Sequence, residues 1–76
     1  LNMKRNVNIS GLVFQILQDN RGRLFKLDEL VQIIYPSDGK GQEKENQAII
    51  LDILIFLDDQ KMLVLDFETD ESSIPL

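Results

Sequence analysis

The side chains best suited to chemistry are carboxylates that crowd the last third of the chain: Asp58, Asp59, Asp66, Glu68, Asp70 and Glu71. Paired carboxylates can act as general acid and base, and several oxygens that converge on one point can hold a hard cation. No loop here has the spacing of a calcium-binding EF-hand with its central glycine, and the short Gly39-Lys40-Gly41 segment cannot form a phosphate loop. We therefore interpret these residues as a solvated acidic face, with no catalytic residue and no metal ligand.

Cysteine and histidine are absent from the sequence. Their absence excludes disulfides, zinc sites built from thiolate or imidazole, and catalysis by a Cys nucleophile or a His base. We accordingly expect no enzymatic activity and no cofactor. A charged fraction of 28% and the shortness of the longest apolar run argue against a membrane span. No secretory-signal pattern opens the chain, and the lack of Cys fits the cytoplasmic location that we expect.

The basic residues are outnumbered and unevenly placed. The chain has 8 Lys and Arg against 13 Asp and Glu, and Lys61 is the only base after position 50. A nucleic-acid binder usually shows the reverse, a basic patch or stripe. We interpret Arg21, Arg23 and Lys26 as a solvated surface paired with nearby carboxylates, because phosphate binding draws its strength from clustered, unopposed charge.

Three helices are predicted from apolar residues that recur at helical spacing. The first is capped by Asn8 or Ser10 and stops at 19–22. The second covers about 27–35, and a proline ends it. The third covers about 42–60.

Two short strands complete the prediction and indicate an α+β fold with a small antiparallel sheet. They cover about 23–26 and about 62–68. Alternation along the second strand places Leu63, Leu65 and Phe67 on one face, and we interpret the positions of all four Phe residues as core-like.

A chain of 76 residues forms one domain at most, so we treat 1–76 as a single domain with a modest core. Residues 1–7 are polar and unpatterned, and we expect a loose arm there. Residues 69–76 are expected to form an acidic turn and tail, because they leave too little chain for a full returning strand.

The third predicted helix is apolar almost all round. Asp52 is the one polar residue between positions 48 and 57. A surface helix is normally apolar along a single stripe. On a helical wheel, one face consists of Asn46, Ile50, Ile53, Leu54, Leu57 and Lys61, and its four apolar residues are ample to close a small core.

The remaining apolar side chains of this helix exceed what that core needs. We predict that a partner chain, most simply a second copy, covers Ile49, Leu51, Ile55 and Phe56. The alternative is that the N-terminal arm or the tail at 74–76 folds back over them.

The order helix, short strand, helix, turn, long helix, strand resembles that of the winged-helix superfamily. Residues 22–31 look like the strand that feeds its second helix, and residues 56–65 look like its third helix running into the first wing strand. The similarity covers 9–67 and implies a three-helix winged-helix-like domain. In that superfamily the third helix enters the major groove of DNA and the wing touches the backbone.

Carried over to this chain, the resemblance implies groove-facing residues in the early third helix, namely Lys40, Gln42, Lys44 and Gln47. Glu43 and Glu45 would face the same phosphates and repel them, and the predicted wing is acidic where it should offer Lys or Arg. Our leading hypothesis is therefore a non-catalytic interaction module that homodimerises through the third helix. The alternative is a DNA-binding transcriptional regulator of winged-helix type.

Overall fold

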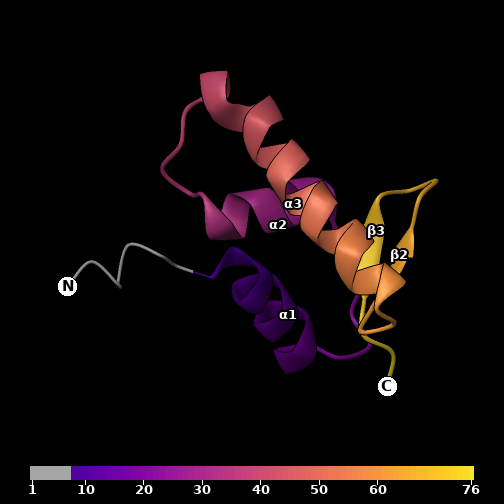
Figure 1. The fold of residues 1–76 in the computed structure, drawn as a ribbon. Helices are drawn as coiled ribbons and strands as arrows, with labels where there is room; N and C mark the ends of the chain where they lie inside the picture. The colour runs from indigo at the N-terminus through magenta and orange to yellow at the C-terminus, as the bar shows by residue number, and fades with distance from the viewer. Residues whose placement is uncertain (1–7) are drawn as a thin grey trace.

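The structure is a computed structural model that describes residues 8–76, apart from the side chain of Lys40. The loose arm expected at 1–7 lies outside this range. Three helices and a three-stranded antiparallel sheet make an α+β fold (Figure 1), as predicted. The elements in chain order are α1 (Ile9–Asp19), β1 (Phe25–Lys26), α2 (Leu27–Ile34), the 3-10 turn η2 (Lys40–Gln42), α3 (Glu43–Asp59), β2 (Val64–Asp66) and β3 (Glu71–Ser73).

The central strand of the sheet, β3, comes from the segment that was expected to be an acidic turn and tail, so that expectation is wrong for these residues. The strand order is β1-β3-β2, and β3 pairs antiparallel with both neighbours. A return strand fits because the chain reverses within 67–70. Asp70 adopts a left-handed φ of 61° there, and its N–H donates to the Asp66 carbonyl at 2.8 Å.

The helix ends follow local rules that the sequence carries. The Asn8 side chain accepts the Gly11 N–H at 3.0 Å, so Asn8 is the N-cap of α1. At the end of α3, the Met62 N–H donates to the Leu57 carbonyl at 2.9 Å, and Lys61 occupies the left-handed position with φ 64°. This is the Schellman arrangement that closes many helices.

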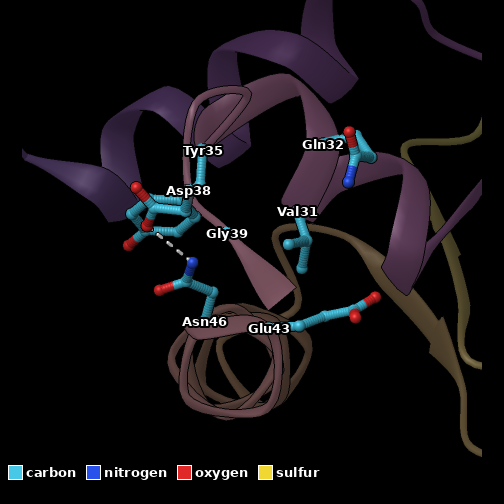
Figure 2. Close-up of a pocket in the computed structure, with 7 residues that line it drawn as sticks. All are labelled: Val31, Gln32, Tyr35, Asp38, Gly39, Glu43 and Asn46. Atoms are coloured by element: carbon cyan, nitrogen blue, oxygen red, sulfur yellow. Dashed lines mark hydrogen bonds between the residues drawn. The ribbon is translucent and has the colours of Figure 1, made fainter. Parts of the chain in front are cut away.

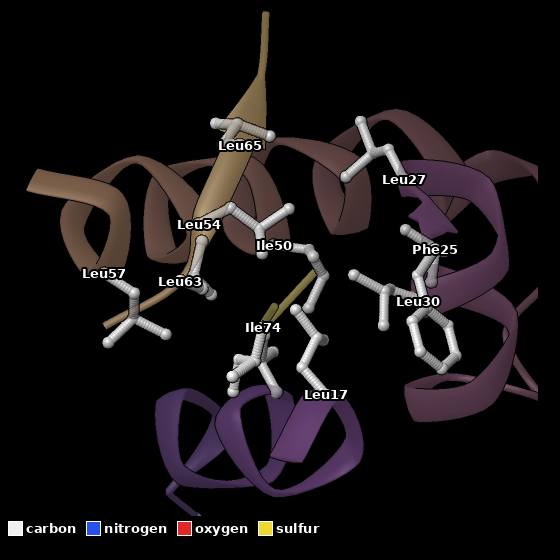
Figure 3. Close-up of a cluster of buried hydrophobic side chains, with 12 residues drawn as sticks. Leu17, Phe25, Leu27, Leu30, Ile50, Leu54, Leu57, Leu63, Leu65 and Ile74 are labelled. Carbon is white, nitrogen blue, oxygen red and sulfur yellow. The ribbon is translucent and has the colours of Figure 1, made fainter. Parts of the chain in front are cut away.

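The core lies where the three helices meet the inner face of the sheet (Figure 3). From α3, Ile50, Leu54 and Leu57 are buried, as predicted, whereas Ile53 is only half-buried and packs against the core. Phe67 does not share the inward face of Leu63 and Leu65. It is 63% exposed, because it belongs to the hairpin turn that follows β2. The buried apolar side chains are Val13, Leu17, Phe25, Leu27, Leu30, Val31, Ile50, Leu54, Leu57, Leu63, Leu65 and Ile74.

The C-terminal residues pack against the turn between α1 and β1. Ile74 is buried in the core, and its carbonyl accepts the Gly22 N–H at 2.8 Å. Gly22 has a left-handed φ of 88°, and a Cβ there would come within 2.8 Å of Leu76 Cγ. The tail therefore packs at the α1–β1 turn, where Ile74 enters the core, and does not lie over α3.

Ser72 places a hydroxyl inside this apolar core. It is fully buried, and the sheet register sets it opposite Phe25 on one side and Leu65 on the other. Within the described residues its Oγ has no hydrogen-bond partner. A buried hydroxyl without a partner destabilises the folded state by about 1–3 kcal/mol.

We expect Ser72→Ala to leave the free energy of unfolding unchanged or to raise it by about 1 kcal/mol, because it removes the unpartnered hydroxyl and leaves almost the same volume. Urea unfolding followed by circular dichroism measures the change. Ser72→Val is the control and should destabilise, since it adds bulk between Phe25 and Leu65. A loss of more than about 1 kcal/mol in Ser72→Ala would mean that the hydroxyl is hydrogen-bonded.

Candidate interaction surface on the third helix

One side of α3 is buried in the core. Asn46, Ile50, Leu54 and Leu57 are each at most 4% exposed. The helix packs against α2, α1 and β2, and Figure 1 shows it running across α2 toward the hairpin of β2 and β3. Successive helical residues are about 100° apart, so the opposite side of α3 faces away from the rest of the fold.

Three apolar side chains on that outer side stay exposed: Ile49 at 44%, Ile55 at 40% and Phe56 at 57%. Leu51, the fourth residue of the predicted interface, is half-buried and packs against the core. The tail does not cover the exposed three, because Ile74 is in the core and Leu76 lies beside Gly22. Their burial by a partner chain stays a prediction.

The exposed side of α3 has a definite pattern, which we call the α3 outer face. Ile49 and Phe56 are seven residues apart and share one edge, while Ala48 and Ile55 share the other edge. Between the two edges runs an acidic row of exposed carboxylates at seven-residue spacing, made of Glu45, Asp52 and Asp59. The predicted interface residues are therefore divided by charge rather than gathered into one apolar patch.

The residues proposed to contact DNA do not form a free basic surface. The Nε2 group of Gln42 donates to Glu45 Oε1 at 3.1 Å, and that of Gln47 donates to Asp28 Oδ1 at 3.0 Å. Lys44 is exposed. Lys40 lies in η2, and its side chain is outside the described part of the structure. Both amides that could read bases thus already contact carboxylates.

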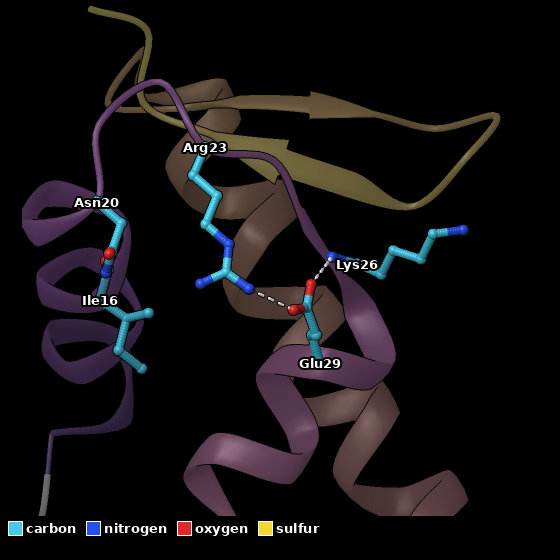
Figure 4. Close-up of polar contacts among 5 residues, drawn as sticks. All are labelled: Ile16, Asn20, Arg23, Lys26 and Glu29. Atoms are coloured by element: carbon cyan, nitrogen blue, oxygen red, sulfur yellow. Dashed lines mark hydrogen bonds and ion pairs between the residues drawn. The ribbon is translucent and has the colours of Figure 1, made fainter.

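Arg23 is held locally, as the sequence indicated. Its guanidinium forms an ion pair with Glu29 of α2 (Figure 4) and lies 4.2 Å from the centre of the Phe25 ring. Glu29 also accepts the Lys26 N–H at 3.2 Å and so helps to start α2. This cluster supports the entry to α2 rather than a phosphate site.

One of the two edges of the sheet, the one formed by β2, already has a hydrogen-bond partner. β2 is an edge strand, and the N–H of Leu65 donates to Asp58 Oδ1 at the end of α3, at 3.2 Å. An edge N–H that already has a partner is less available to an added strand. Asp58 therefore makes strand addition at β2 less favourable and joins the sheet to α3.

A cavity of about 170 Å³ lies beneath the segment 35–42 that joins α2 to α3. Figure 2 shows Tyr35, Asp38 and Asn46 on one side of it and Gln32 and Glu43 on the other. Asn46 Nδ2 donates to Asp38 Oδ2 at 2.8 Å. The sequence did not predict this cavity. The available signal was Asn46 itself, a polar residue on the core face that needs a hydrogen-bond partner.

The described residues hold neither a metal-binding group nor a membrane-spanning helix. Within residues 8–76, no group of three or more Asp, Glu, His or Cys side chains is placed to hold a metal ion. No helix in that same range has the length and apolar character needed to cross a bilayer. No protein-family model matches the chain, and comparison with curated proteins and with solved structures finds no significant match.

Proposed function

We propose that this chain is a non-catalytic protein-interaction module of winged-helix type, and that it contacts its partner through the α3 outer face. The observation that carries the proposal is the exposure of Ile49, Ile55 and Phe56 on one helix. A domain of this size has a small core, and covering exposed apolar side chains with a second chain is a common source of added stability.

The arrangement of the sheet supports the winged-helix assignment. The order α1, β1, α2, α3, β2, β3 matches the resemblance, and β2 and β3 form a hairpin in the place of a wing. Two features depart from the DNA-binding pattern. The segment 35–42 between α2 and α3 is longer than the three or four residues of a helix-turn-helix connection. The hairpin turn carries Glu68 and Asp70 rather than Lys or Arg.

The partner expected from the sequence is a second copy of the chain. In a symmetric dimer both copies use the same surface patch. Each contact between two residues therefore occurs twice, once in each direction. Antiparallel packing of two α3 helices about Asp52 would set Ile49 of one copy against Phe56 of the other. Such pairing supports the homodimer form of the proposal.

We expect self-association to depend on Phe56. If a second copy covers the α3 outer face, the mass measured by sedimentation equilibrium rises above one chain at tens to hundreds of micromolar. Phe56→Asp should then weaken association about a hundredfold, since burial of a Phe side chain contributes about 1.5–3 kcal/mol. The control is Phe67→Asp, which changes an equally exposed Phe on the hairpin turn. Loss of association with Phe67→Asp alone would place the interface on the hairpin.

DNA binding is the second candidate, and the strand order and hairpin favour it. It would use Lys40, Gln42, Lys44 and Gln47. The neighbouring carboxylates lead us to expect no retention on duplex DNA even at low salt, as measured by fluorescence anisotropy. The contradicting result is DNA binding whose affinity falls steeply with salt and which Lys44→Glu abolishes. That result would favour the DNA-binding regulator over the interaction module, because the slope of affinity against salt counts phosphate contacts.

A further inference from the structure

The charges on the α3 outer face restrict what can cover it. Its acidic row, Glu45, Asp52 and Asp59, runs between the two apolar edges. Lys44 is the only cation of α3; it lies one turn before Ala48, at the N-terminal end of the helix and outside the acidic row. Any chain that covers both edges must also cover the acidic row, and a carboxylate removed from water without a partner is strongly unfavourable.

We infer that the occupant of the α3 outer face is an amphipathic helix of another protein that carries a row of Lys or Arg, bound in preference to a second copy of this chain. The inference rests on the proposed function, because it assigns a partner to the same surface. The position of the acidic row selects a partner with basic residues. The exposed apolar side chains alone would not select the charge of the partner.

A second copy fits the apolar edges but not the charge. Antiparallel packing of two α3 helices about Asp52 sets that carboxylate opposite its own copy and sets Glu45 opposite Asp59. Parallel packing in register would bring each carboxylate near its equivalent. Like charges held together at a contact select against the wrong partner. Self-association is therefore expected to be the weaker of the two reactions.

A basic helix satisfies both parts of the surface. The acidic row repeats every seven residues, and a partner helix packed along α3 can present cations at the same repeat, with apolar residues on both sides. From Glu45 to Asp59 the row extends about 21 Å at 1.5 Å per residue, so a partner helix of four to five turns spans it. Strand addition at β2, the sheet edge next to α3, is a poorer alternative, because the N–H of Leu65 already contacts Asp58.

Three synthetic peptides of about 18 residues, each five turns of helix, test the inference against the full chain. The first has an apolar seam and a row of Lys at seven-residue spacing. The second replaces each Lys with Glu, and the third keeps Lys but replaces the apolar seam with Ser. We expect the first to bind at least about tenfold more tightly than either of the others. Calorimetry gives the affinities, and amide chemical shifts should place the first peptide on α3.

Variants of the chain separate charge from apolar contact. Asp52→Asn should weaken the lysine peptide about tenfold and reduce the effect of salt, and Phe56→Ser should weaken it at all salt concentrations. Asp66→Asn is the matched control, since it removes an exposed carboxylate from β2 outside the α3 outer face. Asp66→Asn should bind the lysine peptide as tightly as the unchanged chain does. An equal loss in Asp66→Asn would show that only overall acidity is being measured, and would overturn the inference.

The remaining outcomes distinguish this inference from the proposed function. Equal binding of the lysine and glutamate peptides overturns the assignment of a basic partner and leaves the apolar surface in place. Failure of every peptide, together with self-association that Phe56→Asp abolishes, also overturns it and leaves a homodimer. Failure of every peptide in a chain that does not associate with itself overturns both proposals.

Discussion

The fold depends on the burial of one face of α3. Ile50, Leu54 and Leu57 contribute the centre of a core that also receives side chains from α1, α2 and the sheet. A helix can turn only one side inward, and the four inward positions of α3 are enough to complete a core of this size. The apolar residues that remain on the other side are thus left outside by geometry.

Hydrogen bonds between elements tie the structure together around that core. The Gly22 N–H meets the Ile74 carbonyl, the Leu27 N–H meets the Asp70 carbonyl at 3.1 Å, and the Leu65 N–H meets Asp58. They connect the tail to the α1–β1 turn, the hairpin to the start of α2, and β2 to the end of α3. With its inner side packed and its end joined to the sheet, α3 presents its outer face on a supported element, as a binding surface requires.

The helices were predictable because their signals are local. Apolar spacing located all three, and Asn8 and the proline after Tyr35 marked two of their ends. The strand β3 was missed because Glu71, Ser72 and Ser73 lack the β-branched and aromatic residues that indicate a strand, and its pairing is set by tertiary contacts. The same reason explains Phe67, whose outward position follows from a turn rather than from alternation along β2.

The candidate site was predictable only in part. Helical spacing identified Ile49, Ile55 and Phe56 as outside the core positions, and these residues are exposed. Leu51 was grouped with them but is half-buried and packs against the core. The hydrogen bonds of Gln42 and Gln47 to carboxylates depend on packing between elements, which residue types alone do not specify.

The central claim is that the α3 outer face plays no part in the chain's own core. The most direct test compares adjacent residues of α3 by urea unfolding at low concentration. Phe56→Ser should change the free energy of unfolding by no more than about 0.5 kcal/mol, as exposed sites do. Leu57→Ser should lower it by about 3 kcal/mol or more, since it leaves a cavity and buries a hydroxyl. Comparable losses in the two variants would contradict the account, because Phe56 would then belong to the core.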